Sequence, residues 1–168
     1  MGKLAAIWGV LGVSFFVGSA AFRLSIYSLD AFRSQLNWQH WLFLVIFTIF
    51  MGVSEGYRGF QKQFSPRVIA RALYLWDNPT LTRTLLAPLF CMGFFHATKK
   101  RLMTSYILTV AIVVMILVVR QFPQPWRGLI DVGVVFGLLW GLIAIFAFAI
   151  QIILRKEFSY SPETPDSP

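Results

Sequence analysis

The feature that most constrains this chain is a series of long apolar runs. They cover residues 4–22, 41–57, 85–97, 103–119 and 129–154. A helix rises 1.5 Å per residue and the hydrocarbon core of a bilayer is about 30 Å thick, so roughly 20 apolar residues cross it. A soluble protein of 168 residues cannot bury several such runs in its core. The 13% content of charged residues is also far below the roughly 25% of soluble domains. We therefore expect an all-α, polytopic helical membrane protein.

The run at residues 85–97 decides the number of spans, because it is short and contains Pro88 and Gly93. Lys and Arg near the spans are retained on the cytoplasmic side. If all five runs cross, the two sides of the membrane carry 8 and 7 basic residues, and this difference does not indicate an orientation. If residues 85–97 do not cross, the two sides carry 11 and 4. This bias favours four spans in a bacterial-type inner (plasma) membrane, with both termini cytoplasmic and five spans as the alternative.

The resulting organisation is one membrane domain over residues 1–156. Its expected spans lie at about 4–22, 41–57, 103–119 and 129–154, and residues 85–93 form a re-entrant or interfacial segment packed against the bundle. Phe94 to Phe122 contains no Gly or Pro and therefore reads as one helix. The first run also resembles a secretory signal, but it is long enough to span. Residues 157–168 are rich in Pro, Ser and acids, which predicts a disordered tail.

The connector at residues 58–102 holds most of the positive charge. It carries eight basic residues and one acid, Asp77, and so accounts for +7 of the net charge of +8. Ser65 and Pro66 predict a helix start, and Arg67 and Arg71 share one stripe opposite an apolar face. This pattern is typical of an amphipathic helix lying in the membrane interface.

Three interpretations of the connector stay open: a topology signal with general lipid anchoring, a specific site for an anionic ligand or lipid, and a docking surface for an acidic protein. Each basic residue near an anionic leaflet contributes roughly 1 kcal/mol. Nucleic acid is not expected, because no recognition module is present. The candidate residues for anionic lipid or partner binding are Arg58, Lys62, Arg67, Arg71, His96, Lys99, Lys100 and Arg101.

Two carboxylates, Glu55 and Asp131, are candidates for an intramembrane charge. Ionisable groups inside spans are costly and often mark transport paths. The simpler interpretation is an ion pair on the helix surface, of Glu55 with Arg58 or of Asp131 with Arg127. In the four-span arrangement the two carboxylates belong to opposite membrane faces and do not form one site.

Neither histidine predicts a cofactor. His40 and His96 fall on opposite membrane faces in the four-span arrangement, which disfavours a haem held between helices. His96 is expected at the interface, where it can also join the neighbouring cations in phosphate binding. The single cysteine, Cys91, permits no intrachain disulfide and no cysteine-based metal cage. Hydrolase, zinc-protease and phosphate-loop motifs are not recognisable, so no catalytic residue, metal or cofactor is expected.

The most specific internal pattern is the glycine repeat Gly133, Gly137 and Gly141 on one face of the last span. Glycine at every fourth residue lets a neighbouring helix approach closely and gain van der Waals contact. The neighbour is either another helix of the same subunit or a second copy of the chain.

These features favour a non-enzymatic membrane protein, either an interaction or assembly subunit or a lipid-contacting scaffold. Its expected partners are anionic lipid headgroups and a homo-oligomer or larger membrane complex. The main alternative is an oligomeric small transporter or channel that uses Glu55 or Asp131. A weaker alternative is a protein that binds or modifies lipid phosphates through the basic connector.

Overall fold

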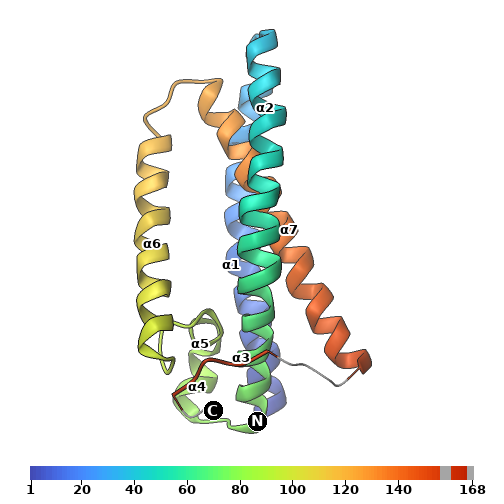
Figure 1. The fold of residues 1–168 in the computed structure, drawn as a ribbon, viewed down its shortest axis with the longest axis vertical. Helices are drawn as coiled ribbons and strands as arrows, with labels where there is room; N and C mark the ends of the chain where they lie inside the picture. The colour runs from blue at the N-terminus through green and yellow to red at the C-terminus, as the bar shows by residue number, and fades with distance from the viewer. Residues whose placement is uncertain (156–159, 166–168) are drawn as a thin grey trace.

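The computed structural model describes residues 1–155 and 160–165, which form helices and no strand. Long helical rods dominate the structure, and two short helices lie beside them (Figure 1). In chain order the elements are α1 (Gly2–Phe32), α2 (Trp38–Met51), the π-helix η1 (Gly52–Phe64), α3 (Ser65–Asp77), α4 (Leu81–Leu85), α5 (Ala87–Met92), α6 (Lys99–Val119) and α7 (Trp126–Arg155).

Four of the described helical segments are long and apolar enough to cross a membrane. They are Gly2–Phe32, Trp38–Asp77, Lys99–Val119 and Trp126–Leu154. This confirms the prediction of an all-helical protein with four candidate spans. The N-terminus and residues 160–165 lie at the same end of the bundle, which we call the terminal end (Figure 1). The connections at residues 33–37 and 120–125 lie at the other end, the far end.

The second span is part of a continuous helix of 40 residues, formed by α2, η1 and α3. At 1.5 Å per residue it is about 60 Å long, twice the thickness of the hydrocarbon core. Pro66 lies in the first turn of α3, where the hydrogen bonding changes from the π to the α pattern. A proline removes a backbone N–H, and a change of hydrogen-bond register is one way in which a helix accommodates it.

The residues predicted to form an interfacial amphipathic helix form α3, which continues the second candidate span, and protein covers its apolar face. Val68, Ile69, Ala72 and Leu75 are buried in the main core cluster, together with residues of α1, α5 and α7. An amphipathic pattern is the same whether the apolar face meets lipid or another helix. The sequence therefore indicates the helix but not what its apolar face contacts.

The segment predicted as re-entrant or interfacial, residues 85–93, contains the last residue of α4 and all of α5, and α5 packs against the first half of α1. A Cβ atom at Gly9 would lie 2.7 Å from Cys91 Sγ, and one at Gly12 would lie 2.3 Å from Pro88 Cγ. Gly93 ends α5 in the left-handed conformation, with φ 84°. The chain then bends until α6 begins at Lys99, so the single helix expected from Phe94 starts five residues later.

The glycine repeat of α7 is occupied within the same chain. Gly133 faces Phe47, Gly137 faces Glu55, and a Cβ at Gly141 would lie 2.4 Å from the ring of Phe60. Trp140 Nε1 also donates a 2.8 Å hydrogen bond to Gln61 Oε1, and Ser65 Oγ donates to the carbonyl of Gly141 at 3.3 Å. We call this contact between α7 and α2–η1 the glycine seam.

The helix α6 stands apart from the other long helices (Figure 1). Residues 106–118 are all exposed in the bundle, and only 6% of its apolar window is buried, against 44% for α1. At the terminal end, Ser105 Oγ donates to the carbonyl of Met92 at 3.3 Å and Tyr106 Oη to that of Phe94 at 3.2 Å. Most of α6 therefore contacts no other part of the described chain.

Candidate anion-binding site at the terminal end

Arg71 organises the terminal end from inside the protein. It is the largest fully buried side chain of the described residues, with 1% of its surface exposed. Its Nε donates to the carbonyl of Phe90 at 2.6 Å, and its Nη1 donates to that of Pro162 at 2.8 Å. Its Nη2 donates to the carbonyls of Phe95 and His96, both at 3.0 Å. The guanidinium carbon also lies 4.2 Å from the centre of the Phe90 ring.

This position differs from the predicted one, in which Arg71 faces anionic headgroups. The bend between α5 and α6 leaves backbone carbonyls without helical partners, and buried acceptors without a donor are costly. A guanidinium carries five N–H donors in a rigid fork and can satisfy several carbonyls at once. Arg71 therefore acts as a structural residue that ties α3, α5, the bend and the C-terminal segment together.

Arg67 and Arg101, from α3 and α6, converge on the carboxylate of Glu163 in the C-terminal segment. Arg67 Nε lies 3.5 Å from Glu163 Oε1, and Arg101 Nε lies 3.8 Å from Glu163 Oε2. The structure therefore brings the two basic clusters of the connector together. We call these three residues the Glu163 site.

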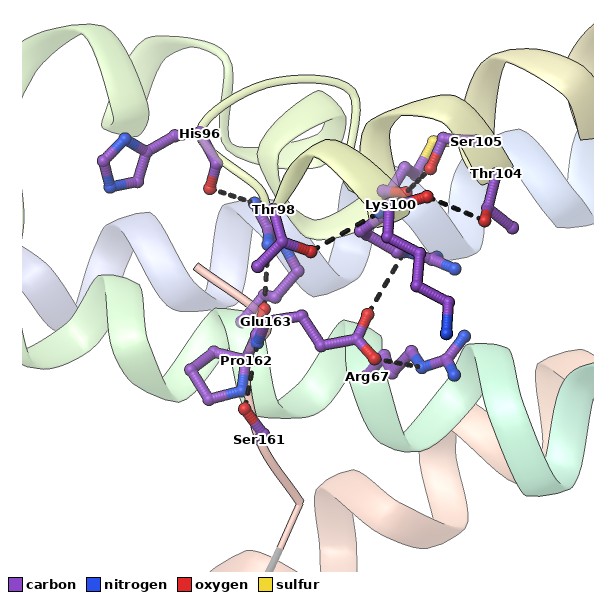
Figure 2. A network of polar contacts seen from close by, with 12 residues as sticks. Arg67, His96, Thr98, Lys100, Thr104, Ser105, Ser161, Pro162 and Glu163 are labelled. Carbon is purple, nitrogen blue, oxygen red and sulfur yellow. Dashed lines mark hydrogen bonds and ion pairs between the residues drawn. The ribbon is translucent and has the colours of Figure 1, made fainter. Parts of the chain in front are cut away.

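The backbone of Glu163 is fixed as well as its side chain. The N–H of Thr98, the residue that caps α6, donates to the carbonyl of Glu163 at 3.0 Å, and Figure 2 shows this contact beside the two ion pairs. Glu163 has φ 51°, a left-handed conformation that is uncommon for a residue with a side chain. Of the predicted disordered tail, residues 160–165 thus lie against the bundle, and residues 157–159 and 166–168 fall outside the described residues.

The Glu163 site is partly open to its surroundings. The exposed fractions of the side chains are 28% for Arg67, 34% for Glu163 and 9% for Arg101. Lys99 and Lys100 are exposed on the first turn of α6. Guanidinium groups bind carboxylates and phosphates with the same donor geometry. The site can therefore hold an oxyanion in place of the Glu163 carboxylate.

His96 takes part in the terminal end through its ring and its backbone. Its Nε2 lies 2.8 Å from Nη2 of Arg83, and its φ of 48° turns its carbonyl toward Arg71. His40 lies at the far end, where its Nδ1 accepts a hydrogen bond from the backbone N–H of Asn37 at 3.0 Å. The two histidines are thus separated by the length of the bundle.

Arg58 and Lys62 lie outside the Glu163 site. Both are exposed on η1, and Lys62 Nζ is 4.6 Å from the ring centre of Tyr57. Because Phe60 packs on Gly141, they lie beside the middle of α7. The unbroken helix from α2 through α3 carries both residues alongside α7.

The two candidate intramembrane carboxylates come from different helices, Glu55 from η1 and Asp131 from α7. Glu55 faces Gly137 across the glycine seam, and Asp131 lines a groove with α1 and α6. Six residues of helix separate Gly137 from Asp131, about 9 Å along the axis. One oxygen of each carboxylate is buried without a hydrogen-bond partner among the described residues. They are closer in depth than expected, but they do not form one site.

The described residues contain no group of three His, Cys, Asp or Glu side chains that could hold a metal ion. Burial raises the pKa of the Cys91 thiol, which lies on α5, to about 12, and the nearby Arg71 opposes this rise. The thiol is therefore protonated at neutral pH and is not available as a nucleophile.

Sequence reasoning missed three participants in the terminal end: Arg83, Glu163 and the carbonyl of Pro162. The charge balance is the signal that could have indicated Glu163, because the connector has eight cations and one acid and the C-terminal tail contains further carboxylates. No family model, curated protein or solved structure matched this chain. A functional interpretation therefore rests on the geometry.

Proposed function

We propose that this protein is a non-enzymatic, lipid-contacting scaffold of a bacterial-type inner membrane that binds anionic phospholipid headgroups at the Glu163 site. The observation that carries the proposal is the convergence of Arg67 and Arg101 on one carboxylate. A lipid phosphate has the same charge sign and similar acceptor geometry, so it competes with Glu163 for the two guanidinium groups.

The proposal places the terminal end at the cytoplasmic leaflet. With four spans, the side that carries the termini has 11 basic residues and the other side has 4. The cytoplasmic leaflet is also the one whose anionic lipids attract clusters of Lys and Arg. Lys99 and Lys100 would add long-range attraction beside the site.

A lipid-retention experiment on the full chain tests this function. The protein is purified in detergent, mixed with phosphatidylglycerol or phosphatidylcholine, and analysed by native mass spectrometry. Loss of two cations at roughly 1 kcal/mol each predicts that the double variant Arg67→Gln, Arg101→Gln retains phosphatidylglycerol about 30-fold less well.

The matched control is Arg58→Gln with Lys62→Gln, which removes the same charge from the same connector but outside the site. We expect this variant to lose much less than the site variant. Equal losses in the two double variants would mean that total charge, not the Glu163 site, governs binding. Covalent change of the added lipid during incubation would instead favour the lipid-modifying alternative.

A small transporter or channel is the second candidate function. The buried oxygens of Glu55 and Asp131 that lack partners among the described residues favour it, because such groups often mark ion paths. The glycine seam is occupied within the chain, so an oligomer would use other surfaces. Flux in proteoliposomes that survives Glu55→Gln combined with Asp131→Asn would remove both carboxylates from this role.

A further inference from the structure

A second polar site lies at the far end, in a groove between α1, the last turns of α6 and the first turns of α7. The groove encloses a cavity of about 280 Å³, close to the lower limit of about 300 Å³ for small-ligand pockets. Its inner wall includes the apolar side chains of Ala20, Leu24, Ile116, Ile130 and Val134. We call it the far-end groove.

The lining of the far-end groove is strongly basic. It includes three arginines, which are Arg23 on α1, Arg120 directly after α6 and Arg127 on α7. The guanidinium carbon of Arg127 lies 4.3 Å from the ring centre of Tyr27, which also lines the groove. The arginine side chains are therefore gathered around one space and available to an anion.

A single carboxylate, that of Asp131, lies among these cations. Asp131 is 4% exposed, and its Oδ2 is buried without a hydrogen-bond partner among the described residues. A buried carboxylate oxygen without a partner is costly, and in native proteins such a group calls for a specific explanation. A ligand in the groove that donates a hydrogen bond would satisfy it.

We infer that the far-end groove binds a phospholipid with a phosphoethanolamine headgroup. The phosphate meets the arginines, the ammonium donates to Asp131, and one acyl chain lies on the apolar wall and continues along α6. The ligand needs both groups, because the arginines require an anion while Asp131 requires a donor. The headgroup carries the phosphate and the ammonium at the two ends of a two-carbon link, and the groove is lined by the three arginines and by Asp131.

This inference is independent of the proposed function, because the far-end groove and the Glu163 site share no residue. It also explains why α6 is separated from the other long helices, since an acyl chain along its exposed faces replaces helix-to-helix packing. Apolar burial of each methylene contributes about 0.8 kcal/mol, so the chain supplies affinity while the headgroup supplies selectivity.

The test compares lipids that differ only in the headgroup. The full chain is purified in detergent and exposed to equal amounts of phosphatidylethanolamine and phosphatidylcholine, and retained lipid is measured by native mass spectrometry. Phosphatidylcholine keeps the phosphate and the positive charge but has no N–H donor. We expect the wild-type protein to prefer phosphatidylethanolamine about tenfold, which corresponds to about 1.4 kcal/mol. Equal retention of the two lipids would overturn the inference without any variant.

Two variants assign the preference to the groove. Asp131→Asn should reduce the preference to about onefold, and Arg127→Gln should weaken retention of both lipids. Glu55→Gln is the matched control, because it removes the other carboxylate with a buried, unpartnered oxygen, on η1 and outside the groove, and it should leave the preference unchanged. Loss of preference in Glu55→Gln, or full preference in Asp131→Asn, would overturn the assignment.

Discussion

The two ends of the bundle use arginine in opposite ways. At the terminal end, Arg71 donates hydrogen bonds to four backbone carbonyls. Arg67 and Arg101 face a carboxylate of the same chain. At the far end, three arginines line a groove, and the one carboxylate among them keeps an oxygen without a hydrogen-bond partner in the described chain. Positive charge alone therefore does not define a binding site. What matters is whether the protein already supplies the groups that satisfy it.

The largest effect is expected from Arg71→Ala. It removes the donors from four buried or half-buried carbonyls, and each unsatisfied buried acceptor costs about 1 to 3 kcal/mol. We therefore expect a loss of more than about 3 kcal/mol in stability, or no folded protein at all. Thermal unfolding in detergent, followed by circular dichroism, measures it.

Arg33→Ala is the control for this variant. Arg33 belongs to the far end, its side chain is 82% exposed, and it pairs only with Asp30 at 3.3 Å among the described residues. An exposed pair of this kind contributes about 0 to 1 kcal/mol. If both variants unfold at similar temperatures, the contrast between the two ends is wrong.

Gly141→Leu tests the glycine seam between α7 and α2–η1. A Cβ at this position would lie 2.4 Å from the ring of Phe60, and overpacking of a tight contact costs about 1 to 3 kcal/mol. Gly18→Ala is the control, because its new Cβ would meet only Leu142, at 4.0 Å. Equal unfolding temperatures for the two variants would mean that the seam accommodates the leucine without a loss of stability.

Replacing Asp131 by asparagine should change stability in the opposite direction to Arg71→Ala. In lipid-free detergent we expect Asp131→Asn to raise stability by about 1 to 2 kcal/mol, because it removes a buried carboxylate whose oxygen lacks a partner. Chemical unfolding of the delipidated protein measures the change. A destabilised variant would show that Asp131 is already satisfied in the protein alone.

The smallest change in stability is expected from Glu163→Gln, which should destabilise the protein slightly, whereas Asp131→Asn should stabilise it. The two ion pairs of Glu163 are long and partly exposed, so their loss should cost less than about 1 kcal/mol of stability. Retention of phosphatidylglycerol should rise, because the internal competitor for Arg67 and Arg101 is weakened. Asp30→Asn removes a carboxylate at the far end and should leave this retention unchanged. Unaltered retention in Glu163→Gln would mean that the Glu163 carboxylate does not compete with the lipid for Arg67 and Arg101.

The sequence predicted the candidate spans well because apolar length is a property of the chain itself. The helix beginning at Ser65 and the separate segment around Pro88 were also indicated by local signals. The continuous helix through Gly52 and Gly56 was not predicted, because glycine and polar residues usually end a span, and the contacts with Phe136 and Trp140 that line these positions are long-range.

The candidate site was predicted only in part. Arg67 and Arg101 were both candidates, but they are 34 positions apart in the sequence, and no local rule brings them together. Arg71 was assigned to the surface because the carbonyls that bind it come from a bend and a tail with no periodic pattern. Whether the glycine repeat packs within the chain depends on the register of α2 and η1 against α7, which composition does not encode.

The isolation of α6 has a consequence for how the sequence can drift. Along residues 107–114 every side chain is exposed in the bundle, so a substitution there disturbs little of the described chain. A mutational library of Leu, Ile, Val, Phe and Met over this stretch should be tolerated almost freely. The same library at Gly137 or Gly141 should be depleted, because there the neighbouring side chain leaves no space. The consecutive helices α6 and α7 would therefore accumulate mutations at very different rates.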